Sequence, residues 1–462
     1  MDNLTDVLDS QLLQNNFSTA AMRIIWSDQN KITQQLKVEA ALSKIEGQLG
    51  VIPQTAAKKI VQSAKIENFR IEELAKQSAE KRHSLIALID HLQVLAGTTA
   101  GEYVHYGATT QDIVDTGTML QVKQAYELLQ KHSVQLLTVL SQQTKRYRHT
   151  LMIGRTHGIQ AIPITFGFKL AIWLDELLRD QQRLDALATN QRFVGNLNGA
   201  VGTYAAFGPQ GPEIERRVLQ ELGLDVPLIS WQPARDRFSE FAAVLGIYSG
   251  TLGKIGHELF NLMKTEVNEV WEPFKKGEIG SSTMPQKRNP ALLEGLASLT
   301  QPVFKDVGLM LESMLIDGER DAIHWRNEWV VLPEITNYLD AQLVNATAIL
   351  SGLQVNAEQM RRNLELQNGL PFAERIMFQL GNAVGKQTAH QLVYQSAMKA
   401  IEQHLSFIDV LYAEDKVRTN FSKAELLSWL DATAQLGSLE EKITAVLKKA
   451  AAITQHKEAE LE

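Results

Sequence analysis

Residues 241–262 read FAAVLGIYSGTLGKIGHELFNL, and apolar side chains recur along this stretch at alternating spacings of four and three residues. The residues at this spacing are Phe241, Leu245, Tyr248, Leu252, Ile255, Leu259 and Leu262. An apolar stripe of this period is typical of a helix that packs against partner helices in a bundle. The stretch therefore predicts a long bundle helix and favours an all-α fold.

Similar stripes lie on both sides of this stretch. Apolar residues keep helical spacing along 38–49, 170–187 and 335–346, and the first of these patterns stops at Gly50 and Pro53. The sequence shows no strand-rich region, no alternation of strands with helices and no internal repeat. Helices with apolar surface on more than one side need other domains or other copies of the chain to cover it. We therefore expect an oligomer whose core is a helix bundle.

Length and composition narrow the classes of function. The 462 residues exceed the size of about 250–300 residues at which one hydrophobic core stops growing, so we expect two or three domains. A net charge of −7 offers no general attraction to nucleic acid or to an anionic membrane. The absence of cysteine excludes disulfides, thiolate nucleophiles and cysteine-based zinc sites. Without a signal peptide or an apolar run of about 18 residues, the chain is expected to be cytoplasmic, with no nucleic-acid or membrane partner.

One polar segment interrupts the helices at 277–290, where the chain reads GEIGSSTMPQKRNP. Its hydroxyls, its free backbone N–H groups and the cations of Lys287 and Arg288 are suited to bind an anion. The eleven residues GSSTMPQKRNP resemble the GSSxMPxKxNP signature of the fumarase/aspartase superfamily. Residues 103–116, YVHYGATTQDIVDT, and 153–167, IGRTHGIQAIPITFG, resemble two further motifs of that superfamily in the same order. The resemblance covers essentially the whole chain.

The resemblance implies a fold and an assembly. Superfamily members are mainly helical and have three domains, with long central helices that form a twenty-helix core in a homotetramer. By this resemblance we expect an N-terminal helical domain over 1–112, a central long-helix bundle over 113–365 and a C-terminal helical domain over 366–462. Each active site would take its three motif segments from three different subunits. The implied substrate is a small dicarboxylate, and neither a cofactor nor a metal is expected, because no ligand cluster of suitable spacing is present.

The superfamily reaction removes a proton from the carbon beside a carboxylate, forms an aci-carboxylate, and expels a leaving group from the adjacent carbon. It needs a base, groups that stabilise the new negative charge, and an acid for the leaving group. By the resemblance, Ser281 is the base, and Lys287 together with loop amides stabilises its alkoxide. His157 matches the general acid, and Glu294 matches a glutamate that orients this histidine.

The resemblance also assigns residues to substrate binding. Thr109 and Thr110 match a Thr-Ser pair that binds a carboxylate through hydroxyls and backbone N–H groups. Two histidines match pocket residues of adenylosuccinate lyases, an arginine is the expected cation for a second carboxylate, and three residues belong to the signature segment. These expected contacts are His83, His105, Arg235, Ser282, Met284 and Asn289.

Two branches of the superfamily compete for this chain. Its body resembles bacterial 3-carboxy-cis,cis-muconate cycloisomerase in segments such as HWRNEWVVLPE at 324–334. Those cycloisomerases usually carry Trp in place of His157 and a small residue in place of Glu294, so the retained pair favours elimination, as in adenylosuccinate lyase. However, an Arg-Tyr pair and a phosphate-binding arginine of adenylosuccinate lyase are replaced here, by Asn16, Phe17 and Trp329.

Three hypotheses remain open at this level. The first is an adenylosuccinate-lyase-type enzyme that releases fumarate from an N-substituted aspartate-like dicarboxylate, with Arg23, Arg320 and Arg326 as possible replacement cations. The second is lactonisation, or lactone opening, on a carboxymuconate. The third is a catalytically silent helical scaffold, against which the intact set of catalytic residues argues.

Overall fold

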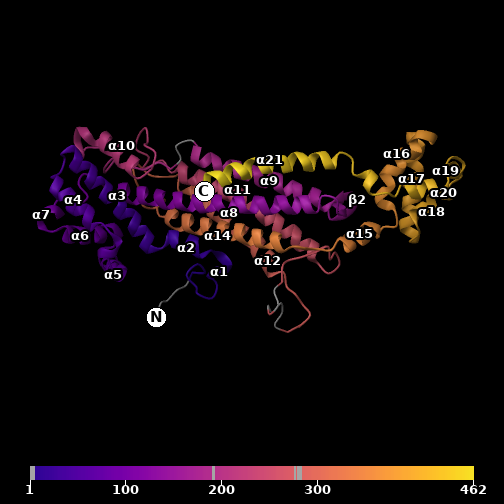
Figure 1. Ribbon diagram of the computed structural model, residues 1–462, viewed down its shortest axis with the longest axis horizontal. Helices are drawn as coiled ribbons and strands as arrows, with labels where there is room; N and C mark the ends of the chain where they lie inside the picture. The colour runs from indigo at the N-terminus through magenta and orange to yellow at the C-terminus, as the bar shows by residue number, and fades with distance from the viewer. Residues whose placement is uncertain (1–5, 190–192, 275–276, 278–282, 462) are drawn as a thin grey trace. The chain divides into compact units, whose positions relative to one another are not determined.

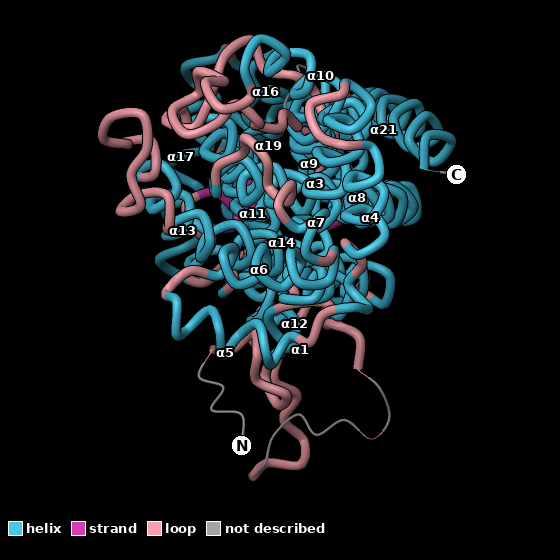
Figure 2. The backbone as a smooth tube through the Cα atoms, turned by 90° about the vertical axis from the view of Figure 1, so that its left-hand side faces the viewer, coloured by secondary structure: helices cyan, strands magenta, loops and turns pink. Residues whose placement is uncertain are grey.

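The computed structural model describes residues 6–189, 193–274, 277 and 283–461. Helix dominates these residues, and strands are confined to two small sheets (Figure 2). The predicted all-α class is confirmed. Within the described ranges, no helix combines the length and the apolar character that a membrane span requires.

The chain divides into two compact units, each assembled from separated segments. Unit 1 comprises Met1–Ser133, Arg179–Gly253 and Gly295–Val344, and unit 2 comprises Val134–Leu178, Lys254–Glu294 and Asn345–Glu462. Five helices contribute residues to both units: α8 (Thr110–Arg146), α9 (Phe166–Thr189), α11 (Asp236–Met263), α12 (Ala291–Ser298) and α14 (Asn327–Gly352). The three-domain division with boundaries after residues 112 and 365 stays a prediction.

Unit 1 gathers the N-terminal helices. α3 packs on α4 and α10, while α6 packs on α4, α5 and α7 (Figure 1). The elements that lie wholly in unit 1 are α1 (Gln14–Phe17), α2 (Ala20–Trp26), α3 (Asp28–Leu49), α4 (Gln54–Ser63), η1 (Ile66–Asn68), α5 (Ile71–Lys81), α6 (Ser84–Ala96), α7 (Thr98–Gly101), η2 (Gly208–Gln210), α10 (Gly211–Glu221) and α13 (Thr300–Glu312).

Unit 2 gathers the C-terminal helices and both sheets. α16 packs on α17, and α18 packs on α17, α19 and α20 (Figure 1). The elements that lie wholly in unit 2 are β1 (Leu151–Thr156), β2 (Ile159–Thr165), β3 (Val270–Trp271), β4 (Gln354–Val355), α15 (Ala357–Glu365), η3 (Leu370–Phe372), α16 (Ala373–Val384), α17 (Lys386–Gln403), α18 (Phe407–Tyr412), α19 (Asp415–Asn420), α20 (Lys423–Ser428), η4 (Thr433–Gln435) and α21 (Leu439–Leu461).

The apolar stripe from Phe241 to Leu262 is buried along its whole length in α11, as its period predicts. Burial of each such side chain stabilises the fold by about 1.5–3 kcal/mol relative to exposure. The predicted helix end near residue 50 is also confirmed. α3 ends at Leu49, and Gly50 follows with φ +73°, the left-handed conformation that glycine adopts without a Cβ clash.

A short hairpin that the sequence patterns did not predict carries one of the motifs. β1 and β2 pair antiparallel around a two-residue turn, His157–Gly158, in which both residues have positive φ, +53° and +78°. A two-residue turn with positive φ at both positions has a backbone twist that matches the right-handed twist of the flanking strands. Gly154 and Pro163 lie inside these strands, and both residue types are depleted in strands. The pairing shifts register between Ile153 and Arg155, at Gly154, while Pro163 pairs with Ile153.

Candidate active site

In unit 1 the predicted carboxylate-binding pair lies at the N-terminus of a long helix. Thr110 is the first residue of α8, and Asp112 in its first turn accepts the backbone N–H of Thr109 at 3.0 Å. The same carboxyl group accepts the N–H groups of Asn198 and Gly199, each at 3.0 Å. Burial raises the pKa of Asp112 to about 7, while these hydrogen bonds and the charge of His105 act against the rise. Asp112 therefore fixes the backbone that presents the two threonines.

Two further side chains converge on these threonines. His83 is the N-cap of α6, and its Nδ1 accepts the N–H of Ile86 at 3.2 Å, which leaves the proton of the neutral ring on Nε2. That Nε2 lies 3.4 Å from Thr110 Oγ1, and Arg320 donates through Nη1 to Thr109 Oγ1 at 3.0 Å. This region thus brings together two hydroxyls, an imidazole, a guanidinium and the positive end of a helix dipole. Such groups are suited to bind an anion.

Arg235, the expected cation for a second carboxylate, is buried between two carboxyl groups. It is 1% exposed, and its guanidinium donates to Asp115 at 2.7 Å and to Glu328 at 2.6 Å. The indole of Trp325 also donates to Asp115, at 2.9 Å. Since both carboxyl partners are buried, Arg235 is committed to compensating their charge. A substrate contact by Arg235 stays a prediction, and Arg320, which donates to Thr109, is a second cation that the fold offers.

In unit 2 the predicted general acid, His157, is exposed at the tip of the β1–β2 hairpin. Arg155 on β1 anchors this hairpin, because it donates through Nη1 and Nη2 to the two carboxylate oxygens of Glu269 at 3.0 and 2.8 Å. Glu269 is fully buried and also accepts from Asn363 Nδ2 at 2.8 Å. No sequence pattern links Glu269 or Asn363 to the hairpin, since both lie far from it in the chain.

Part of the signature segment lines a cationic pocket in unit 2. Ser281 and Ser282 lie outside the described residues. The backbone N–H of Lys287 donates to the carbonyl of Met284 at 3.1 Å and closes a turn. The pocket has a volume of about 810 Å³, and its described lining contains three cationic side chains and no carboxylate. Its polar and signature-segment residues are Lys264, Thr265, Asn268, Met284, Gln286, Lys287, Arg288, Asn289, Pro290 and Gln354.

Glu294, the predicted partner of the general acid, is exposed in the first turn of α12. Across the described residues, no hydrogen bond or ion pair joins it to His157 within the chain. The carboxyl group at the start of this helix is instead Glu272, which accepts the N–H groups of Leu292 and Leu293 at 3.4 and 3.0 Å. Glu272 therefore anchors the end of the signature segment, and it lies in the stretch before the motif that the sequence patterns left unassigned.

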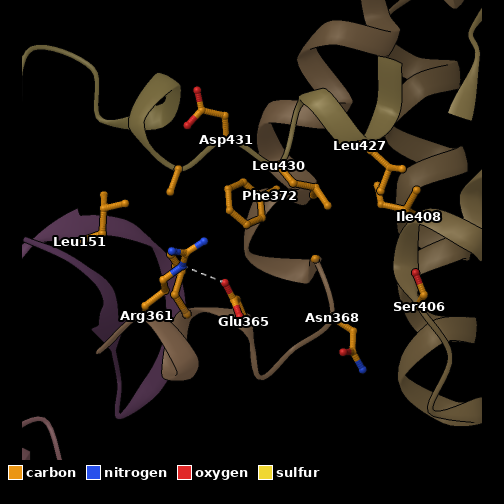
Figure 3. Close-up of a pocket in the computed structure, with 13 residues that line it drawn as sticks. Leu151, Arg361, Glu365, Asn368, Phe372, Ser406, Ile408, Leu427, Leu430 and Asp431 are labelled. Carbon is orange, nitrogen blue, oxygen red and sulfur yellow. Dashed lines mark hydrogen bonds and ion pairs between the residues drawn. The ribbon is translucent and has the colours of Figure 1, made fainter. Parts of the chain in front are cut away.

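A second pocket of unit 2 contains none of the predicted site residues. It has a volume of about 640 Å³, and its floor is apolar, with Phe372, Ile408 and Leu430 among its lining (Figure 3). The cation at its edge, Arg361, is paired with Glu365 at 3.3 Å (Figure 3). Because this arginine is already paired with a carboxylate, we expect the pocket to bind a dicarboxylate more weakly than the pocket lined by Lys287.

Comparison with known proteins identifies the family of this chain. The Lyase family matches residues 13–304, and the adenylosuccinate lyase C-terminus family matches residues 369–446. The chain belongs to the Lyase family of the fumarase/aspartase superfamily. The predicted superfamily membership and the prediction of a lyase are both confirmed.

The similar proteins include enzymes with named substrates. N-acetyl-S-(2-succino)cysteine lyase of Enterococcus italicus is 54% identical over 96% of this chain and 96% of its own length. The enzyme of the same name from Dickeya dadantii is 52% identical over 96% of this chain and 97% of its own length. Among solved structures, 3-carboxy-cis,cis-muconate lactonizing enzyme from Pseudomonas putida has a TM-score of 0.90 at 34% identity, covering 96% of this chain and 100% of that one.

Proposed function

We propose that this lyase catalyses β-elimination from an S-substituted succinate such as N-acetyl-S-(2-succino)cysteine, releasing fumarate and a thiol. The observation that carries this proposal is the identity of 54% and 52%, over nearly the full length, to two enzymes named for that substrate. The proposal keeps the predicted elimination and the predicted fumarate product. It replaces the nitrogen leaving group of an adenylosuccinate-type substrate with sulfur.

The positions that would bind a nucleotide phosphate support this change of substrate. Phe17 packs edge-on against Tyr338, with ring centroids 6.5 Å apart. Trp329 packs against Trp325 at 5.1 Å, and Lys31 Nζ lies 5.6 Å from the centre of the Trp329 ring. Trp329 therefore stands where adenylosuccinate lyases place a phosphate-binding arginine, and the uncharged Asn16 stands at the arginine of the Arg-Tyr pair. A succinylated thioether carries no phosphate and does not need those ligands.

In the proposed reaction, two groups of hydroxyl and cationic side chains hold the two succinyl carboxylates. In unit 1 these are Thr109, Thr110 and Arg320, and in unit 2 Lys287 with its cationic neighbours. Ser281 removes a proton from the methylene carbon, and the electron pair of that C–H bond becomes the second bond of the product alkene. The C–S bond breaks as this bond forms, and the sulfur leaves with its electron pair and receives a proton from His157.

We further propose that the active site is completed by other copies of the chain in a homotetramer. His157 and Glu294 are both exposed, and no contact joins them within the described part of one chain. Exposed large apolar side chains such as Ile172, Ile247 and Val344 lie on the long helices α9, α11 and α14, where a partner copy would cover them. Mixing an inactive Ser281→Ala chain with an inactive His157→Ala chain is expected to restore part of the activity. Mixtures that stay as inactive as either variant would argue against shared sites.

The substrate proposal is tested by following fumarate in the ultraviolet together with free thiol. Turnover of N-acetyl-S-(2-succino)cysteine is expected to give the two products in equal amounts. Adenylosuccinate and 3-carboxy-cis,cis-muconate serve as comparison substrates. A higher kcat/KM for adenylosuccinate, or loss of the carboxymuconate without fumarate, would replace the proposal with one of the two alternatives.

A further inference from the structure

A buried carboxylate pairs with a histidine just ahead of the threonine pair in unit 1. Glu39 on α3 is fully buried, and its Oε1 lies 2.6 Å from Nδ1 of His105. His105 lies four residues before Thr109 in a turn where its φ is +61°, and 17% of its side chain is exposed. A non-glycine residue is held at positive φ only where its surroundings compensate the strain. The hydrogen bond to Glu39 supplies such a constraint.

Few other polar or charged groups contact the Glu39–His105 pair. The second oxygen of Glu39 has no hydrogen-bond partner among the described residues, so His105 is the cation available to this carboxylate. From α8, the Asp112 carboxyl also acts on His105. Burial alone would lower the pKa of His105, but the charge and hydrogen bond of Glu39 and the charge of Asp112 outweigh it and raise the pKa.

A second carboxyl group on the same helix provides a contrast. Glu46, seven residues after Glu39, is also fully buried, and neither of its oxygens has a hydrogen-bond partner among the described residues. Burial, with the charge of Glu39, raises the pKa of Glu46 to about 9. Glu46 is therefore protonated near neutral pH, whereas Glu39 has a cationic partner. Two similar side chains on one helix thus differ in their surroundings, because only one of them meets a histidine.

We propose that Glu39 is a positioning residue of the active site, which holds His105 with Nδ1 as the donor and directs Nε2–H toward a substrate carboxylate bound at Thr109 and Thr110. This inference rests on the proposed function. Asp112 links the two features, because it accepts the N–H of Thr109 and acts on His105. An imidazolium held by a carboxylate is a fixed donor with a positive charge, and a charge-assisted hydrogen bond is about twice as strong as a neutral one.

The pH dependence of this arrangement has a defined sign. The imidazolium form binds the carboxylate, so binding weakens as pH rises through the pKa of His105. Glu39 raises that pKa and extends tight binding to higher pH. Removing its charge is expected to move the alkaline limb of kcat/KM to lower pH and to raise KM more than it lowers kcat. Loss of one charge-assisted bond of roughly 1.5–3 kcal/mol corresponds to a ~10- to ~100-fold fall in kcat/KM near neutral pH.

The test compares Glu39→Gln with Glu46→Gln, a matched control on the same helix with the same burial. The titration of His105 is followed by hydrogen–deuterium exchange at its ring Cε1 with mass spectrometry, a readout that does not require turnover. Glu39→Gln is expected to lower the pKa of His105, and Glu46→Gln is expected to leave it unchanged, since a protonated Glu46 and Gln are both neutral. Thermal unfolding and tetramer content of both variants confirm folding.

Kinetics with N-acetyl-S-(2-succino)cysteine complete the experiment. A shifted alkaline limb and a raised KM in Glu39→Gln alone would support the positioning role. An unchanged His105 titration in Glu39→Gln, or an equal shift in Glu46→Gln, would overturn it. If the wild-type enzyme did not turn over the thioether, the proposed substrate would fail, while the titration would still decide the Glu39–His105 pairing.

Discussion

The ion pair that anchors the His157 hairpin gives the sharpest prediction from the structure. Arg155→Ala removes two hydrogen bonds, of 3.0 and 2.8 Å, and leaves the fully buried Glu269 with Asn363 as its remaining side-chain donor among the described residues. Breaking a buried pair by removing one partner costs about 3–5 kcal/mol, because an uncompensated charge stays buried. Exchange of backbone amides in β1 and β2 is therefore expected to accelerate by roughly 10²- to 10⁴-fold, and kcat to fall.

Amide hydrogen exchange with mass spectrometry on peptides that cover 151–165 measures this effect locally. Arg216→Ala is the matched control, because the Arg216–Glu213 pair is exposed and such surface pairs contribute little to stability. The double variant Arg155→Met with Glu269→Met removes both charges and is expected to recover most of the hairpin's protection. Hairpin exchange in Arg155→Ala that was no faster than in the control would refute the reasoning.

Four further outcomes are expected. Ser281→Ala should assemble normally and lose most turnover; a near-normal rate would remove Ser281 as the base. Arg320→Ala should lower kcat/KM by ~10- to ~100-fold, mainly through KM, at unchanged thermal stability; a change in stability alone would make this arginine structural. His157→Trp should slow a succinylated amine more than a succinylated thiol, because a thiol is the more acidic leaving group; equal losses on the two substrates would argue against the acid role. Because the pKa of Glu46 is raised to about 9, the fold loses stability as pH rises toward that value, and Glu46→Gln should flatten the fall in Tm, whereas parallel Tm curves would contradict the buried neutral carboxyl.

The predicted site residues fall into two groups. The placement of some follows from neighbouring residues in the chain, and the placement of others depends on segments far away in the chain. Thr109 and Thr110 were expected to act together, and the structure places them at the start of α8, because a helix N-terminus is a local feature of the chain. His83 was also expected near them and does lie beside Thr110. Arg235 was expected to bind a substrate carboxylate, and it lies buried between Asp115 and Glu328. Nothing in the residues around Arg235 shows that two carboxylates from other segments enclose it.

The sequence by itself determined the helical class, the burial of the stripe from Phe241 to Leu262, the end of α3 at Leu49 and the superfamily. These depend on periodicity, on the conformational freedom of glycine and on contiguous motifs, all of which act over a few neighbouring residues. Only the tertiary structure decided that Arg235 compensates buried charge and that Glu39 pairs with His105. Both outcomes depend on desolvation and on ion pairs between segments far apart in the chain, whose energies are set by folding and not by the local sequence.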